Sequence, residues 1–232
     1  MRTGWLNRSG VYRVEHLPCP HPGVRIDPIA TGVLHTIEGS LESGLNVFRQ
    51  HYAPHFTVGL DRNHKKRIIQ HVPLGYMASA LDNDPGGVET NRLARVQIEV
   101  AAFSKTFPYH FDTATTDVLA SLLATLSMLN VVPLRRNFPD KMPPLPWARE
   151  SFSRRTVRYW NRLPGWYGHV EVPENDHWDP GALRWDFLLD RAMSKESNRT
   201  QNAKPKPRKL DVVRTMPIKR AAAKASPASC HA

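Results

Sequence analysis

Cysteine is scarce in this sequence and long apolar runs are missing, and each absence excludes a class of protein. The two cysteines, Cys19 and Cys230, lie near opposite ends of the 232-residue chain, and neither belongs to a CxxC motif. A disulfide framework and a thiolate zinc site are therefore not expected, and the chain fits a reducing compartment. No run of about 18 apolar residues is present, which excludes a transmembrane helix. Without the apolar core of a signal peptide at its start, the chain is expected to stay in the cytoplasm after synthesis.

Acidic residues are few toward the C-terminus, so most of the net charge lies there. The formal net charge is +11 at pH 7, and residues 193–232 hold ten Lys and Arg against two acids, which is eight of those eleven charges. The composition beyond Asp190 cannot bury enough apolar surface to offset chain entropy. We therefore predict an irregular lead-in over 1–27, one catalytic domain over 28–190 and a disordered basic tail over 191–232.

Strand and helix patterns alternate along the predicted domain. Strands are predicted over 29–37, 55–61, 67–72, 95–101 and 165–172, and helices over 40–51, 117–129 and 151–160. Ser40 can serve as the N-cap of the first helix, and the second and third strands predict a hairpin. In the fourth strand the apolar residues alternate, so that Gln97 and Glu99 share the opposite face. This interleaving indicates an α/β domain with a central sheet.

Side chains that bind metal ions gather in one Pro- and Gly-bounded stretch, Gly168–Gly181. The stretch holds two histidines and two aspartates, and a further histidine, His35, ends a predicted strand far upstream. Imidazole nitrogen and carboxylate oxygen suit a catalytic zinc ion, which takes three protein ligands and leaves one position to water. A zinc hydrolase is therefore the leading hypothesis, provided that the fold brings the two distant segments together.

Four motifs in order carry a family resemblance. They are His-Thr at 35–36, His-Phe-Thr-Val at 55–58, Ile-Glu-Val at 98–100, and a segment that begins Gly-His at 168–169 and ends His-Trp-Asp-Pro-Gly at 177–181. With them, residues 28–187 resemble the type-2 N-acetylmuramoyl-L-alanine amidases, which include phage endolysins and are related to the peptidoglycan recognition proteins. The ending of the last motif is similar to that of amidase modules from phages of mycobacteria and related actinobacteria. The resemblance implies a central mixed β-sheet flanked by helices.

The same resemblance implies a zinc amidase that cleaves the bond between N-acetylmuramic acid and the L-alanine of the stem peptide. It makes His35, His169 and Asp179 the ligands of Zn²⁺ and Glu99 the catalytic acid/base. His177 stands where many relatives carry a lysine or arginine near the scissile carbonyl. Such a zinc ion activates water and polarises the carbonyl, while Glu99 could pass the proton to the leaving nitrogen and His177 could stabilise the oxyanion.

Three further residues are candidates for substrate contact. Asn91 and Arg92 precede the catalytic strand and could line the substrate groove, and Trp178 either stacks on sugar or packs beneath its loop. The chain also departs from the family pattern at two positions. Pro54 stands where many relatives carry a tyrosine before the strand histidine, and His177 is not a permanent cation. Both departures concern the oxyanion rather than the metal site.

Peptidoglycan is the expected substrate, and the expected function is that of a phage or prophage endolysin, a monomer released from the host cytoplasm through a holin-type pore. Two alternatives stay open within the resemblance: a non-catalytic peptidoglycan-binding module, and a cytoplasmic amidase that recycles muropeptides. A two-carboxylate glycosidase is a third alternative. The carboxylates that could serve it are Glu38, Glu42, Glu171, Glu174 and Asp176.

The basic tail has three interpretations. It is either a solvated segment without a partner, or a segment attracted to anionic wall polymers or a lipid surface, or a nucleic-acid-binding arm. Residues 191–232 contain no aromatic side chain that could stack on bases, so specific nucleic-acid binding is not expected.

Overall fold

A computed structural model describes residues 4–203 of the chain, apart from residues 22, 81–87, 105–110, 137–156, 174–176, 178 and 182. The N-terminal part of the helix predicted over 151–160 and the predicted tail beyond residue 203 lie outside the described residues.

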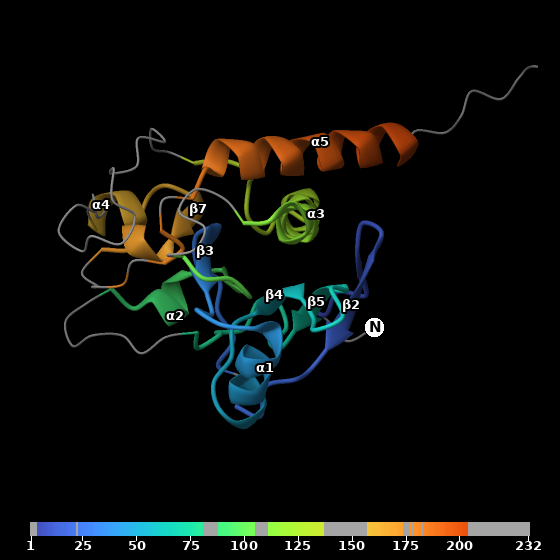
Figure 1. Ribbon diagram of the computed structural model, residues 1–232. Helices are drawn as coiled ribbons and strands as arrows, with labels where there is room; N and C mark the ends of the chain where they lie inside the picture. Colours follow the sequence, from blue (N-terminus) through green and yellow to red (C-terminus); the bar gives the residue numbers. More distant parts are fainter. Residues whose placement is uncertain are drawn as a thin grey trace, which may run out of the picture.

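A seven-stranded sheet forms the centre of the molecule (Figure 1). Its strands, in spatial order, are β1 (Arg8–Ser9), β2 (Tyr12–His16), β5 (Lys66–Gln70), β4 (Phe56–Leu60), β6 (Val96–Val100), β3 (Thr31–Thr36) and β7 (Gly165–Gly168). The pairs β1–β2 and β4–β5 are antiparallel and the other four are parallel. The predicted mixed sheet and the predicted hairpin are thus confirmed.

Helices cover both faces of the sheet, as expected for an α/β fold. Helix α3 (Thr113–Met128) packs on one face with α5 (Trp185–Ala203) lying across it, and α1 (Leu41–Gln50) lies on the opposite side of the sheet (Figure 1). Two one-turn helices, α2 (Thr90–Leu93) and α4 (Val157–Trp160), precede β6 and β7. The main apolar core lies between the sheet and α3, where Val96, Ile98 and Val100 are fully buried. Gln97 and Glu99 therefore belong to the other face of β6.

Side-chain caps set where the helices begin. Ser40 accepts a hydrogen bond from the backbone N–H of Ser43 (3.2 Å), which confirms the predicted N-cap of α1. Asp112 caps α3 by accepting from the N–H groups of Ala114 and Thr115 (2.9 Å each). The helix thus begins at Thr113, earlier than the predicted residue 117, because the cap and not the apolar periodicity determines its start.

The prediction of an irregular lead-in over residues 1–27 is wrong for its middle part. Strand β2 pairs in parallel with β5, and its Val14 is 4% exposed opposite Ile68. A five-residue strand shows too little alternation to stand out in a sequence, and its stability comes from a partner strand some fifty residues later.

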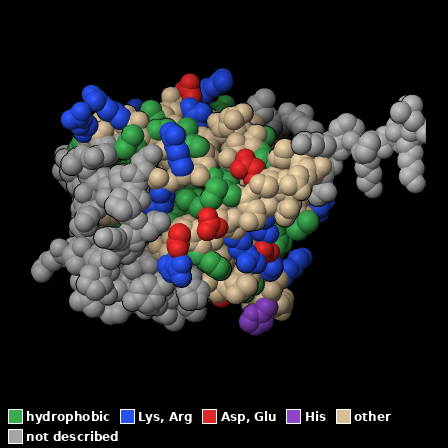
Figure 2. Space-filling model, turned by 90° about the horizontal axis from the view of Figure 1, so that it is seen from above, with side chains coloured by type: hydrophobic (Ala, Val, Ile, Leu, Met, Phe, Trp, Pro, Cys, Tyr) green, Lys and Arg blue, Asp and Glu red, His purple; other side chains and the backbone are tan. Residues whose placement is uncertain are grey.

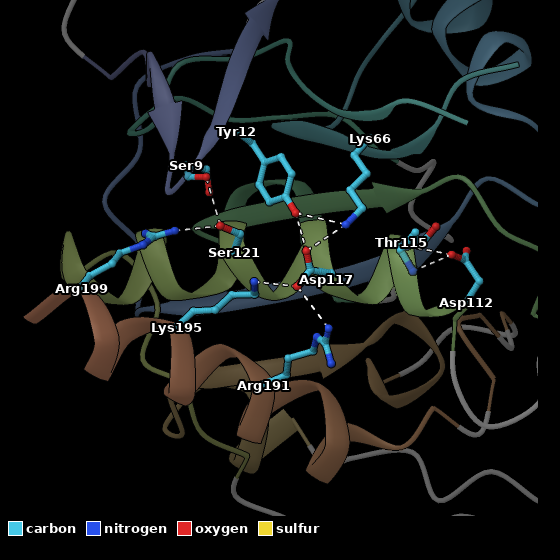
Figure 3. Close-up of polar contacts among 11 residues, drawn as sticks. Ser9, Tyr12, Lys66, Asp112, Thr115, Asp117, Ser121, Arg191, Lys195 and Arg199 are labelled. Carbon is cyan, nitrogen blue, oxygen red and sulfur yellow. Dashed lines mark hydrogen bonds and ion pairs between the residues drawn. The ribbon is translucent and has the colours of Figure 1, made fainter. Parts of the chain in front are cut away.

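The prediction of a disordered tail from residue 191 is wrong for residues 191–203, which continue α5. Arg191, Lys195 and Arg199 are spaced four apart and face α3 (Figure 3). Lys195 and Arg191 lie 2.7 and 3.3 Å from the carboxylate of Asp117, and Arg199 donates to the hydroxyl of Ser121 (2.7 Å). These three basic residues beyond residue 190, which suggested disorder, are therefore paired with side chains of α3.

The strand predicted over residues 165–172 ends at Gly168, where the chain enters a 3₁₀ turn, η2 (His169–Glu171). The carboxylate of Glu171 accepts from the backbone N–H of Gly168 (2.9 Å) and so closes the turn. The side chain of Glu171 thus ends the strand, although the apolar residues around it fit a longer strand.

Positively and negatively charged side chains are interspersed on the face of the molecule that carries α5. Lys and Arg side chains lie beside Asp and Glu side chains on this face (Figure 2). By sequence, residues 204–232 hold eight Lys and Arg against one acid, which is seven of the eleven net positive charges. Any long-range attraction to polyanions would thus originate mainly from that segment.

His71 is a buried imidazole, and both of its ring nitrogens form hydrogen bonds. Its Nδ1–H donates to the carbonyl of Leu17 (2.9 Å), and its Nε2 accepts from the hydroxyl of Thr57 (2.8 Å). Burial lowers the pKa of His71 from 6.5 to about 4, against the opposing effect of the Leu17 carbonyl.

The free energy of unfolding is therefore expected to fall as the pH is lowered from about 6.5 to about 4. Unfolded His71 takes up a proton below about pH 6.5 whereas the folded residue does so only near pH 4, so acid costs about 1 kcal/mol of stability per pH unit in this window. Urea unfolding across the window measures the slope. His71→Gln should flatten it by that amount, and His64→Asn, in an exposed turn, should not; equal slopes for wild type and His71→Gln would contradict the prediction.

Candidate metal centre

Two adjacent parallel strands bring the histidines together. Leu34 of β3 is in register with Gly168 of β7. The residues that follow them, His35 and His169, therefore lie side by side at the same end of these two strands. Their ring centroids are 4.6 Å apart, and both residues are 2% exposed.

Asp179 completes a compact group of three buried side chains. Its Oδ1 lies 3.1 Å from Nδ1 of His169, and its Oδ2 lies 3.6 Å from Nδ1 of His35. One ligand atom from each residue lies within 4.8 Å of the other two, and no other such group of His, Cys, Asp or Glu occurs among the described residues. The three residues predicted to bind zinc thus meet in the fold.

The geometry of this group fits a zinc ion. Tetrahedral Zn²⁺ with bonds of about 2.0–2.2 Å separates its ligand atoms by about 3.3–3.6 Å, close to the two measured distances. Two imidazoles and one carboxylate also form a donor set typical of catalytic zinc, with a fourth position left for water.

Backbone contacts fix Asp179 in place. Oδ2 accepts from the N–H of Thr36 (3.2 Å), and the carbonyl of Asp179 accepts from the N–H of Val170 (2.8 Å). A Cβ atom at Gly168 would lie 2.9 Å from Cδ of Pro180, so only glycine permits this approach of the two segments. The loop that carries Asp179 is therefore tied to both histidine-bearing segments.

The ionisation of Asp179 and His169 favours metal binding at neutral pH. Burial alone would raise the pKa of Asp179, but the imidazoles of His169 and His35 hold it well below its usual range. Burial lowers the pKa of His169 to about 4, despite the opposing charge of Asp179. An ionised carboxylate and a neutral imidazole are the forms that coordinate a metal.

Glu99 lies on β6 in register with His35 of β3. Its side chain is buried, and among the described residues no group donates a hydrogen bond to its Oε2. Burial raises the pKa of Glu99 to about 7; the nearby His35 lowers it, and Asp179 and Glu38 raise it further. A bound cation would lower this pKa, so that Glu99 is ionised at neutral pH and can accept a proton. Such a carboxylate beside a metal site suits a general base.

The other predicted site residues lie in different settings. His177 is 47% exposed, and its ring stacks on that of His169 with 4.1 Å between centroids. Asn91 is buried and accepts a hydrogen bond from Gln97 (3.0 Å), whereas Arg92 is exposed. Trp178 lies outside the described residues. Their roles in binding substrate or oxyanion stay predictions.

Two supporting contacts were missed in the sequence. Gln97 contacts His35. The only indication of this contact in the sequence was that Gln97 shares a face of its strand with Glu99. Arg136 forms a bidentate ion pair with Glu171 (3.0 Å from Nη1 to Oε2), for which no local pattern exists. The pair gives Glu171 a structural partner, which argues against its service in a two-carboxylate glycosidase; Glu174 and Asp176 lie outside the described residues.

Fold and site together define a class of protein: a mixed-sheet α/β domain with a buried His-His-Asp group suited to a metal ion. Among the described helices, none is both long and apolar enough to cross a membrane.

Comparisons with known proteins found similarity only to solved structures. No family model matches the sequence, and no curated protein matches it significantly. The endolysin N-acetylmuramoyl-L-alanine amidase LysCS from Clostridium intestinale URNW is similar with a TM-score of 0.45 and 10% identity, over 79% of this chain and 97% of that one. PlyL is similar with a TM-score of 0.35 and 15% identity, over 53% of this chain and 77% of that one. At these values neither likeness supports an inference about function, which depends on the site itself.

Proposed function

We propose that this protein is a zinc-dependent peptidoglycan amidase that cleaves the bond between N-acetylmuramic acid and L-alanine, and that it acts as a phage or prophage endolysin. The observation that carries the proposal is the buried group of His35, His169 and Asp179 with the carboxylate of Glu99 on the neighbouring strand. The motif resemblance supplies the substrate class.

The protein's own groups would divide the work of hydrolysis. A zinc ion held by the two histidines and Asp179 would supply an activated water and polarise the amide carbonyl. Glu99 is buried beside that position and would accept the proton of the attacking water and deliver it to the alanine nitrogen, which must leave as an amine. His177, exposed and stacked on His169, would face the substrate and donate to the carbonyl oxygen.

The same proposal includes the place of action and the partners. The enzyme would be held in the host cytoplasm until release and would then act on the cell wall as a monomer. The segment 204–232 would attract anionic wall polymers or lipid surfaces through its excess of seven positive charges. This attraction would weaken with salt over a Debye length of about 8–10 Å.

The first experiment digests mycobacterial-type peptidoglycan with the purified full chain and identifies the products by mass spectrometry. New L-alanine amino termini with intact glycan strands, lost on chelation and restored by zinc, are expected. Cleaved glycan would contradict the proposal, and binding without cleavage would favour the non-catalytic module. Activity on soluble anhydro-muropeptides but not on intact wall would favour the recycling amidase.

Glu99→Gln is expected to lower kcat by about 10²–10⁴ while zinc affinity stays unchanged, because the amide cannot carry the proton. Glu42→Gln is the control, since Glu42 accepts from the N–H of Arg62 (2.9 Å) outside the metal centre and an amide oxygen can do the same. Rates measured on the digested wall decide the matter. A Glu99→Gln variant as fast as Glu42→Gln would remove Glu99 from the mechanism.

A further inference from the structure

Gln97 carries a buried amide and is the second residue of β6. It is fully buried and shares the face of the strand that also carries Glu99. A buried amide is costly unless its donors and acceptor are satisfied. The contacts that satisfy Gln97 therefore show what the residue does.

The orientation of the Gln97 amide follows from a backbone group. The N–H of Ala80 donates to Oδ1 of Asn91 (3.2 Å), which identifies that atom as an acceptor. The Nε2 of Gln97 donates to the same Oδ1 (3.0 Å) and to the carbonyl of Ala78 (2.8 Å). Both amide hydrogens are thus used, and the oxygen of Gln97 must point the other way.

That oxygen meets His35. Oε1 of Gln97 lies 3.1 Å from Nε2 of His35. Because the amide oxygen can only accept, Nε2 of His35 must carry the proton. The lone pair of the neutral ring is then on Nδ1, the atom that lies 3.6 Å from Oδ2 of Asp179.

We propose that Gln97 is a positioning residue for the metal centre: it fixes the Nε2–H tautomer of His35 and so presents Nδ1 to the zinc ion. The inference rests on the proposed function for the identity of the metal. The His35 ring is thus tied to the backbone at Ala80 by a series of hydrogen bonds. They run through the side chains of Gln97 and Asn91. Such outer contacts set ring orientation and typically change metal affinity by about 10–100-fold when removed.

Backbone contacts also explain why an amide serves here. A carboxylate at residue 97 would accept from His35 equally well, but it would face the carbonyl of Ala78 and Oδ1 of Asn91 without a hydrogen to donate. The backbone of Gln97 is held as well, since its N–H donates to Nδ1 of His55 (3.1 Å). Position 97 thus needs two donors and one acceptor in a neutral group.

The test compares two buried glutamines. Gln70 on β5 is also fully buried, accepts from the N–H of Leu6 (2.8 Å) and donates to the carbonyls of Gly4 (2.8 Å) and Val72 (3.0 Å). Phe56, its partner in register, belongs to the core beneath α3, on the face opposite the metal centre. Gln97→Met and Gln70→Met therefore each lose two donated hydrogen bonds and one accepted hydrogen bond, and only Gln97 touches a predicted ligand.

Two readouts are measured on the full chain, with urea unfolding to confirm that each variant is folded. The first is zinc affinity by competition with a chelating dye. The second is the tautomer of His35 in the zinc-free protein, from two-bond ¹H–¹⁵N spectra at mildly alkaline pH. Gln97→Met is expected to weaken zinc binding by about 10–100-fold and to lose the pure Nε2–H signature. Gln70→Met is expected to keep both, and Gln97→Glu, which retains the acceptor, should keep the tautomer.

The outcomes separate the two proposals. A Gln97→Met variant that binds zinc as tightly as Gln70→Met and keeps the tautomer would overturn the role of Gln97. Should Gln97→Met fail to fold, an Nδ1–H signature for His35 in the wild type would overturn it equally. A wild type with the Nε2–H tautomer but no zinc affinity would instead contradict the proposed function.

Discussion

Asparagine in place of Asp179 is expected to abolish zinc binding and to slow peptidoglycan cleavage by about a thousandfold or more. Asp179 is the one negatively charged member of the group, and its two oxygens lie 3.1 and 3.6 Å from the imidazoles of His169 and His35. Metal catalysis is worth several kcal/mol of transition-state stabilisation, and each 1.36 kcal/mol is about tenfold in rate. Zinc titration and mass-spectrometric rate measurement on the same samples check both expectations.

The fold should survive this substitution, because an asparagine oxygen can still accept from the N–H of Thr36. Asp61→Asn is the matched control. Its side chain is 11% exposed, as is that of Asp179, and it accepts from two backbone N–H groups in the β4–β5 turn. An Asp179→Asn variant that binds zinc and cleaves at the rate of Asp61→Asn would refute the assignment of this ligand.

Methionine in place of Arg136 is expected to lower the free energy of unfolding by about 3–5 kcal/mol. Arg136 and Glu171 are each 4% exposed, and the Arg136 guanidinium also lies over the ring of Trp185, 4.4 Å from its centroid. The variant removes this bidentate cation from the buried Glu171 carboxylate. Because Glu171 closes the turn that carries His169, zinc affinity should fall as well.

Urea unfolding of three variants tests this pair. Arg184→Met removes an exposed cation from Asp186 (60% and 43% exposed) and should cost less than about 1 kcal/mol. Adding Glu171→Gln to Arg136→Met removes the buried carboxylate charge but keeps an acceptor for the N–H of Gly168, so it should restore part of the loss. Equal losses for Arg136→Met and Arg184→Met would contradict a special role for the buried pair.

Elements that depend on nearby residues could be predicted from the sequence. The Ser40 cap needs only a hydroxyl and an N–H three residues later, and the hairpin of β4 and β5 needs only a short turn between alternating runs. The face shared by Val96 and Ile98 follows from alternation alone. All three predictions are confirmed because the forces behind them act within a few residues.

Elements whose partners lie far away in the chain could not be predicted. Val14 is buried because β5 lies beside it, and Arg191 and Lys195 of α5 are held by Asp117 more than seventy residues earlier. The pair of Arg136 and Glu171 spans 35 residues and leaves no periodic trace. Composition describes such segments as polar, and only the folded neighbours decide whether a polar residue is solvated or paired.

The candidate site was predictable where chemistry and motif order coincide. His35, His169 and Asp179 meet as the resemblance implies, and Glu99 lies on the adjoining strand. The contact of Gln97 with His35 could not be predicted, because a glutamine in a strand has no evident role until its neighbours are known. Its partner Asn91, predicted only as a substrate contact, is buried against it.

The position of β3 inside the sheet has a consequence for synthesis on the ribosome. Its neighbours, β6 and β7, begin at residues 96 and 165. At about 5–20 residues per second, β7 follows β3 after roughly 7–30 seconds of elongation. Throughout that interval one edge of β3 has no strand to pair with, which is the condition under which nascent chains associate wrongly or recruit chaperones. His35 therefore emerges early and waits for its two partner ligands, so the metal centre is among the last parts of the domain to be assembled.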